Sequence, residues 1–191
     1  EYRTSMAGLT AQMFQAKCYE EQGKIGEAIG IYHQVLDQPA VILRDLKRMV
    51  HYFYIVALTK RKQYPLAADE AVKWLQTYDR KDERRSTEGL GVFYELARSL
   101  DAQMTENTPR AERDAATKKI VEALSQVVRT PSRFKNDAVA MLKKYKPGTA
   151  IEPRELARLS FDEAVLQADE AMGSRDWERG VALLRAAVAK A

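Results

Sequence analysis

The sequence predicts an all-α protein built from stacked helical hairpins, and three observations favour this fold class. Helix-forming residues are abundant, whereas only nine glycines and six prolines occur in 191 residues. Helix formers lose little rotamer freedom in a helix. Apolar residues recur at helical spacing in two segments between Ala16 and Pro39. The pattern returns 39 residues later, so that Ala67 corresponds to Ala28.

The first predicted hairpin pairs a helix at about 6–22 with a helix at about 25–37. Its apolar positions recur every three or four residues: Met6, Leu9, Met13, Ala16 and Tyr19, then Ala28, Ile31, Tyr32, Val35 and Leu36. Gly23 separates the two segments, where a glycine can end a helix in the left-handed conformation. A hairpin of this length cannot bury its apolar face alone, so we expect stacked neighbours.

A second hairpin is predicted from a helix at about 41–62 and a helix that begins near Pro65. Proline is tolerated in a first helical turn, where its missing N–H would have no partner. The two apolar faces hold Val50, Phe53, Tyr54, Ala57 and Leu58, then Ala67, Ala68, Ala71, Trp74 and Leu75. The charge-rich segment 79–85 follows, and its composition predicts a solvated loop or a frayed helix end.

Three further helices are predicted at about 87–104, 110–129 and 132–145. Gly89 and Gly91 begin the first of them, and their small size favours close packing there. The segment 146–153 contains two prolines and a glycine, which is typical of a break between structural units. A final hairpin is predicted at about 154–190, with Ala164, Ala168 and Ala171 facing Trp177, Gly180, Leu184 and Ala187.

These elements predict three parts. Residues 1–146 form helical hairpins plus a following helix, residues 147–153 form a linker, and residues 154–191 form a C-terminal hairpin that we expect to pack on the same array. The chain begins with Glu1 and ends within a helical pattern, which favours a segment of a longer protein.

Segments 9–39 and 161–191 resemble tetratricopeptide repeats, in which small residues on two helices pack together across a short turn. The residues that carry the resemblance are Ala16, Gly23, Ala28, Tyr32 and Val35, and then Ala168, Trp177, Gly180, Leu184 and Ala187. Two intervening segments match less well, through Ala67, Ala97 and Ala116. Ile55 stands where a small residue is expected, and Lys62 where a turn glycine is expected. The resemblance implies a right-handed α-solenoid of about three to four irregular repeats.

The resemblance also implies a concave groove, lined by the first helix of each hairpin, that binds a peptide or helix of a partner protein. It would contain Met13, Lys17, Tyr52, Phe53, Val56, Lys60, Tyr94 and Arg98, adjoined by Phe14 and Glu95. This mixture of apolar, aromatic and cationic side chains suits a partly hydrophobic segment with an acidic residue. Met13 and Lys17 do not reproduce the lysine–asparagine pair with which some repeats bind a C-terminal carboxylate. Alternatively, neighbouring helices cover many of these residues.

Carboxylates are plentiful, but histidine and cysteine are sparse and no motif indicates a catalytic cleft, so we expect no enzyme activity, cofactor or metal in this segment. His33 and His51 fall on different helices without ligand spacing, and they are expected at the surface or in packing. Cys18 has no histidine near it in sequence, and it is expected to be a small, mostly buried residue.

Charge does not favour a nucleic-acid partner. The net charge is +4, and the two signs alternate along most of the chain. Lys60–Lys62 and Lys143–Lys146 lie near helix C-termini, where cations meet the negative end of the helix dipole. No apolar run approaches the roughly 20 residues that span a bilayer. The single cysteine slightly favours a reducing, cytoplasmic compartment, while export or membrane tethering of a longer protein stays open.

The leading hypothesis is therefore a non-enzymatic scaffold for protein–protein interaction. A first alternative is a structural or self-associating segment of a larger repeat protein, a homo-oligomer included. Val181, Leu184 and Val188 favour it, because they form an apolar stripe on a last helix where a polar outer face is usual. A second alternative is a helical accessory domain of an enzyme whose catalytic part lies elsewhere.

Overall fold

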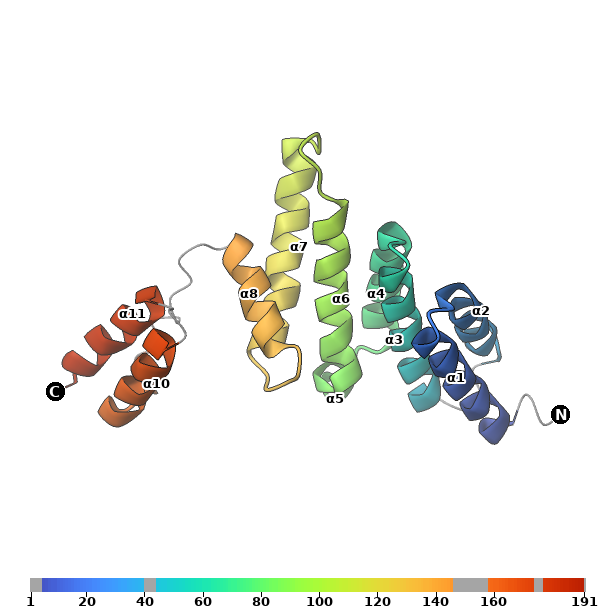
Figure 1. Cartoon of the computed structure of the whole chain (residues 1–191), viewed down its shortest axis with the longest axis horizontal. Coiled ribbons are helices and arrows are strands. Elements are labelled where there is room, and N and C mark those ends of the chain that lie inside the picture. Colours follow the sequence, from blue (N-terminus) through green and yellow to red (C-terminus); the bar gives the residue numbers. More distant parts are fainter. Residues whose placement is uncertain (1–4, 40–43, 146–157, 174–176, 191) are drawn as a thin grey trace. The chain divides into compact units, whose positions relative to one another are not determined.

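The computed structural model describes residues 5–39, 44–145, 158–173 and 177–190, and all regular structure in these ranges is helical. This confirms the all-α prediction. The helices are α1 (Met6–Glu21), α2 (Ile25–Leu36), α3 (Arg44–Lys60), α4 (Tyr64–Thr77), α5 (Lys81–Arg85), α6 (Thr87–Gln103), α7 (Arg110–Val128), α8 (Lys135–Tyr145), α10 (Phe161–Gly173) and α11 (Trp177–Val188) (Figure 1). The chain divides into two compact units, Glu1–Leu142 and Lys143–Ala191.

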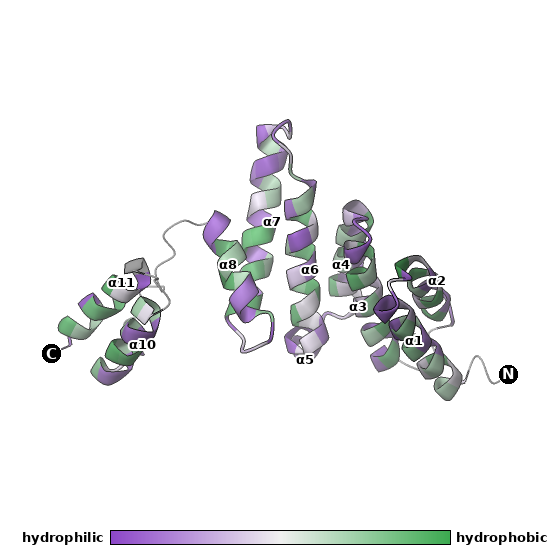
Figure 2. Cartoon of the chain, viewed as in Figure 1, coloured by the Kyte–Doolittle hydropathy of each residue, from purple (hydrophilic) through white to green (hydrophobic). Residues whose placement is uncertain are grey.

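In the first unit each helix packs on helices that are close to it in sequence. The helix α2 lies against both α1 and α3, and α4 lies against both α3 and α6 (Figure 1). The first helices of successive hairpins, α3 and α6, also touch, and α7 packs on α6. Figure 2 shows both hydrophobic and hydrophilic residues along these helices. Each helix buries apolar residues against its immediate neighbours, although α1 also exposes Met6 and Phe14.

The turns of the first two hairpins have the same hydrogen bonds, 39 residues apart. In the first turn Gly23 N–H donates to the Glu20 carbonyl at 3.0 Å, and Lys24 N–H donates to the Tyr19 carbonyl at 2.9 Å. In the second turn Lys62 N–H donates to Thr59 at 2.9 Å and Gln63 N–H to Leu58 at 3.0 Å.

Both turns therefore end their first helix in a Schellman motif, which satisfies the last carbonyl groups. Gly23 has φ of 75°, as its position in the sequence predicts, and Lys62 has φ of 63° in the same conformation. A lysine thus occupies a left-handed position that favours glycine.

The core of the first two hairpins is formed by side chains that come from both helices of each hairpin. It contains Leu9, Met13, Ala16, Ala28, Tyr32, Val35, Leu46, Val50, Tyr54, Ala57, Leu58 and Ala67. Trp74 is also completely buried, and its indole N–H donates to the Arg48 carbonyl at 3.0 Å. Further along, Ala97 is fully buried, whereas Ala116 is half-buried.

The charged segment 79–85 is exposed as predicted, except at Glu83. It contains the short helix α5, and the Glu83 side chain is only 3% exposed. Arg44 donates from Nε and Nη2 to the two Glu83 carboxylate oxygens at 2.7 and 2.9 Å. The pair was missed because its members lie 39 residues apart. Gly89 is needed beside this helix, since a Cβ there would meet the Glu83 carbonyl oxygen at 2.4 Å.

The second unit contains the hairpin of α10 and α11. Ala168, Ala171 and Leu183 form its core, with Leu159 packed against them. Leu183 is fully buried and Leu184 is 37% exposed, so the inward position predicted for Leu184 is wrong. The two residues are 100° apart around the helix, and only one of them can face α10.

The remaining predictions for this unit have different outcomes. Gly180 lies close to α10, because a Cβ there would meet Met172 Cγ at 2.7 Å. Trp177 begins α11, and its side chain lies outside the described part of the structure, as does the predicted linker 147–153. No helix in the described ranges is long and apolar enough to cross a membrane.

Candidate functional site

The predicted groove residues come from the first helices α1, α3 and α6, and the structure divides them by burial. Met13 is 3% exposed and Tyr52 is 4% exposed, so both belong to the interior. The other members reach the surface to different extents, and we call them, together with Phe14, the first-helix face: Phe14, Lys17, Phe53, Val56, Lys60, Tyr94 and Arg98. Phe14 is its most exposed apolar member, with 59% of its surface accessible.

Tyr52 is buried because α6 approaches its ring closely. A Cβ added to Gly91 would meet the Tyr52 ring at 2.5 Å, so the glycine provides the space that the ring occupies. Arg133 Nη2 donates to the Tyr52 hydroxyl oxygen at 3.2 Å. Burial raises the pKa of Tyr52, and the Arg133 guanidinium acts against this shift. Tyr52 therefore joins α3 to α6 and offers little surface to a partner.

A buried carboxylate organises the cations at one end of the first-helix face. The Glu20 side chain is completely buried, and its Oε1 accepts a 2.6 Å hydrogen bond from the Tyr32 hydroxyl. Lys17 donates to the same oxygen at 3.2 Å, and Lys60 donates to Oε2 at 2.7 Å. Burial alone raises the pKa of Glu20, but the hydrogen bonds from Lys60 and Tyr32, with the Lys17 charge, lower it overall. Two lysines thus share one anion.

Aromatic rings fill the spaces between these cations. Lys17 Nζ lies 4.7 Å from the centre of the Phe53 ring, and the Arg98 guanidinium lies 5.7 Å from the centre of the Tyr94 ring. Tyr94 also stacks on Phe134 with ring centres 5.7 Å apart. Such cation–ring contacts hold long side chains against the helices while their charges stay in water.

A second buried carboxylate lies beside Arg98. Glu95 is 4% exposed, and its two oxygens accept from Arg98 Nη1 at 3.0 and 3.1 Å. Burial raises the pKa of Glu95 in spite of the opposing charge of Arg98. The pKa shifts of Glu20 and Glu95 are therefore opposite, because burial dominates at Glu95, whereas three donors outweigh burial at Glu20.

The histidines and the cysteine form no reactive cluster in the described structure. His51 is buried, and its Nε2 lies 2.9 Å from Glu70 Oε2, while Lys73 on the same helix as Glu70 donates to Oε1. Burial lowers the pKa of His51. Cys18 is exposed, so its predicted burial is wrong: α1 turns Ala16 and Glu20 inward, and position 18 lies between them on the outer side. The described residues hold no group of three potential metal ligands.

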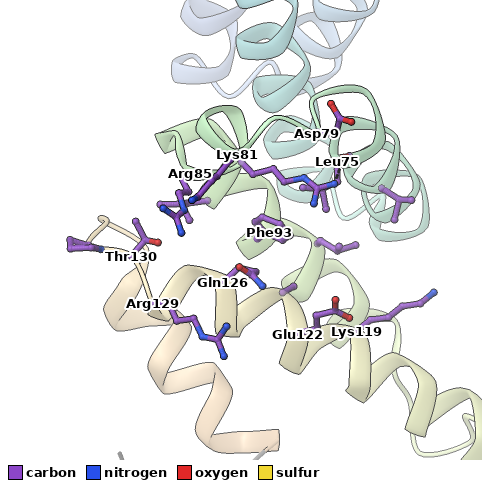
Figure 3. A pocket seen from close by; sticks show the side chains of 16 residues that line it. Leu75, Asp79, Lys81, Arg85, Phe93, Lys119, Glu122, Gln126, Arg129 and Thr130 are labelled. Carbon is purple, nitrogen blue, oxygen red and sulfur yellow. Dashed lines mark hydrogen bonds between the residues drawn. The ribbon is translucent and has the colours of Figure 1, made fainter. Parts of the chain in front are cut away.

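A different concave surface, which the sequence did not reveal, lies between α4, α5, α6 and α7 (Figure 3). We call it the α4–α7 groove, and it has a volume of about 850 Å³. Its lining combines apolar residues of α4 and α6 with charged residues of α5 and α7. Helical spacing could have indicated the apolar residues of this groove, because Leu75 and Phe93 each lie on the predicted apolar face of a helix. The approach of the charged segments depends on tertiary packing.

Comparison with known proteins finds no protein-family model that matches this chain and no curated protein with a similar sequence.

Proposed function

We propose that this chain is a non-enzymatic scaffold that binds a segment of a partner protein on its first-helix face. The observation that carries the proposal is the continuity of this face across α1, α3 and α6. Lys60 and Arg98 are exposed on it, and Phe53, Val56 and Tyr94 are half-buried between the cations. Such a surface offers apolar contact area and exposed charge on rigid helices.

The packing of the helices supports a solenoid similar to tetratricopeptide repeats. Each second helix of the first two hairpins lies between its own first helix and the next one. The 39-residue recurrence of the turn hydrogen bonds adds a backbone repeat to the sequence pattern. In a solenoid the first helices share one surface, and this surface serves as the binding face in many repeat proteins.

The charge balance of the face favours a partner segment with at least one carboxylate. Lys17 and Lys60 together exceed the single charge of Glu20, and both remain partly exposed. Apolar anchors of the partner would contact Phe14, Phe53 and Val56, and the cations would set its register. Met13 and Tyr52 are buried, and their packing holds in place the helices that carry the first-helix face.

Selection from a phage-displayed random-peptide library tests this proposal. One group of the peptides selected on the wild-type chain should lose about tenfold or more in affinity for a Tyr94→Ala/Arg98→Ala variant, which corresponds to about 1.4 kcal/mol. Arg110→Ala serves as the control, because Arg110 is 95% exposed at the start of α7. Circular dichroism must show unchanged helicity. Equal binding by both variants would contradict the assignment of the face.

A second candidate function, self-association through the second unit, is favoured by its exposed apolar residues. Val181, Leu184 and Val188 are 46%, 37% and 74% exposed and follow one stripe of α11. An exposed apolar stripe of this kind is typical of a surface that packs against another protein. Sedimentation equilibrium should show concentration-dependent association that Val181→Lys/Val188→Lys abolishes. A monomer at all concentrations would eliminate this candidate.

A further inference from the structure

The α4–α7 groove differs chemically from the first-helix face, because its floor is apolar and its rim is strongly cationic. The floor comes from Val72 and Leu75 of α4 and from Leu90, Phe93 and Leu96 of α6. Figure 3 shows Phe93 between α5 and α7, near the middle of the concave surface. Val72 is 40% exposed there, so part of this apolar floor is in contact with water.

The rim carries five cationic side chains against two carboxylates. The cations are Lys81, Arg84, Arg85, Lys119 and Arg129, and the carboxylates are Asp79 and Glu122. In Figure 3 Arg85 and Arg129 lie toward one end of the groove, and Lys119 lies toward the other. Positive charge therefore lines both ends of an apolar floor.

These cations are not neutralised by the described part of the chain. Lys17, Lys60 and Arg98 on the first-helix face all pair with buried carboxylates. In contrast, no carboxylate of the described residues forms an ion pair with a cation of the rim. Arg84 directs one nitrogen to the Leu75 carbonyl at 2.9 Å, which fixes its side chain over the end of α4. A concentrated positive potential over a concave apolar surface attracts an anionic ligand.

We propose that the α4–α7 groove docks an acidic, amphipathic peptide segment of a partner protein. Apolar side chains of the segment cover Val72, Leu75 and Phe93, and its carboxylates face Arg85, Arg129 and Lys119. A segment with both apolar and acidic side chains contacts the apolar floor and the cationic rim of the groove. A small inorganic anion leaves the apolar floor exposed to water, and a single-stranded nucleic acid finds only one aromatic ring, Phe93, on which to stack a base.

This site is separate from the surface of the proposed function. Successive residues of an α-helix are 100° apart, so Phe93 and Leu96 occupy a different side of α6 from Tyr94 and Arg98. The groove also uses α5 and α7, which contribute no residue to the first-helix face. Each surface can therefore be disabled without the other.

The first experiment uses a phage-displayed random-peptide library selected on the wild-type chain and sequenced in full. We expect one enriched group to carry Asp or Glu on either side of Leu, Phe or Met. Val72→Glu should reduce the affinity of these peptides at least tenfold, because it places an anion on the apolar floor. Leu66→Glu is the matched control: Leu66 is 41% exposed on the same helix and lies outside the groove. Loss in both variants, or in neither, would overturn the proposal.

The second experiment reverses charge on the rim. Arg85→Glu/Arg129→Glu should weaken the same peptides about tenfold or more, and Arg110→Glu on α7 should leave them unchanged. Added salt should weaken wild-type binding, because the rim cations are exposed to solvent. The Tyr94→Ala/Arg98→Ala variant should bind these peptides normally, so failure of the first-helix face and failure of the groove give different results. Selection without acidic enrichment, or displacement of the peptides by single-stranded RNA at the same residues, would refute a peptide site.

Discussion

The first two hairpins, α1–α2 and α3–α4, repeat one backbone geometry with different side chains. Their turns form equivalent hydrogen bonds with an offset of 39 residues, although Gly23 occupies the left-handed position in one and Lys62 occupies it in the other. Ala28 and Ala67 are corresponding residues, and both are fully buried. The close contact between the helices is therefore kept in both hairpins.

The larger core side chains are distributed differently in the two second helices. Tyr32 of α2 corresponds to Ala71 of α4, and Val35 corresponds to Trp74; all four are fully or almost fully buried. The bulky aromatic residue has thus moved by about one helical turn while a smaller one takes its former place. Cores tolerate such exchanges when the total volume and the pattern are kept. A structural repeat can persist here while the residues that would reveal it in the sequence change.

Among the variants that test this comparison, removal of the bulky Trp74 from the second hairpin should have the largest effect on stability. Trp74→Ala should destabilise the first unit by about 3–5 kcal/mol, because it leaves a cavity and removes the indole hydrogen bond to the Arg48 carbonyl. Val35→Ala at the corresponding position should cost less, about 1–2 kcal/mol, since fewer methyl groups are removed. Urea denaturation followed by circular dichroism measures both. Equal losses of unfolding free energy in the two variants would contradict the difference in side-chain size between these two core positions.

The next effect concerns the polar residues that differ between the hairpins. Glu20 in the first corresponds to Thr59 in the second, whose hydroxyl donates to the Ile55 carbonyl of its own helix at 3.1 Å. Glu20→Ala should cost about 2–3 kcal/mol, chiefly because the buried Tyr32 hydroxyl loses its acceptor. Adding Tyr32→Phe should then recover part of the loss in a double-mutant cycle. Strictly additive effects would contradict the coupling of these two residues.

The two buried carboxylates should respond to pH with opposite signs. The folded pKa of Glu20 lies below its ordinary value of 4.5, so its contribution is present above that value and is lost as the pH falls through the folded pKa. The folded pKa of Glu95 is raised, so ionised Glu95 destabilises the fold near neutral pH, and this cost disappears on acidification.

Melting temperatures measured from neutral to acidic pH test whether Glu20 and Glu95 contribute to stability with opposite pH dependence. Glu20→Gln should reduce the loss of stability on acidification. Glu95→Gln should raise the melting temperature near neutral pH, with a difference from wild type that shrinks at low pH. The same response from both variants would be inconsistent with the opposite shifts.

The smallest effect comes from exchanging the turn residues. Gly23→Lys should cost about 1 kcal/mol, because a side chain at φ of 75° strains the backbone and no neighbouring atom would otherwise clash. Lys62→Gly should stabilise by about 0.5–1 kcal/mol, as relief of strain outweighs the added freedom of the unfolded chain. Chemical denaturation of the two variants should give opposite signs. Two losses would mean that the Lys62 side chain itself contributes to stability.

Much of the fold could be predicted because amphipathic spacing and turn residues are local signals. The helix predicted at 6–22 is observed as Met6–Glu21, and the one at 87–104 as Thr87–Gln103. The burial of Glu83 in α5 was missed, because its partner Arg44 is far away in the sequence. Local composition cannot show such a pairing.

The candidate site was less predictable, since exposure depends on which helices come to cover a residue. Lys60 and Arg98 reach the surface as the sequence suggests, whereas Tyr52 lies under Gly91 of α6. The α4–α7 groove requires α5 and α7 to approach α4, a geometry that no single segment encodes. Functional residues on helices are therefore harder to predict here than the helices themselves.

The neighbour-to-neighbour packing of α1 to α7 has a consequence for how the first unit folds. Because the contacts join helices that are close in the sequence, loop closure is inexpensive and folding is expected to be fast. The helix α3 packs against α2, α4 and α6, whereas the hairpin α1–α2 joins the rest of the unit chiefly through α3. Amide hydrogens of α3 should therefore exchange most slowly, and α1–α2 should open first while the remaining helices stay folded. Lys60, which donates to Glu20 across this boundary, would report the opening.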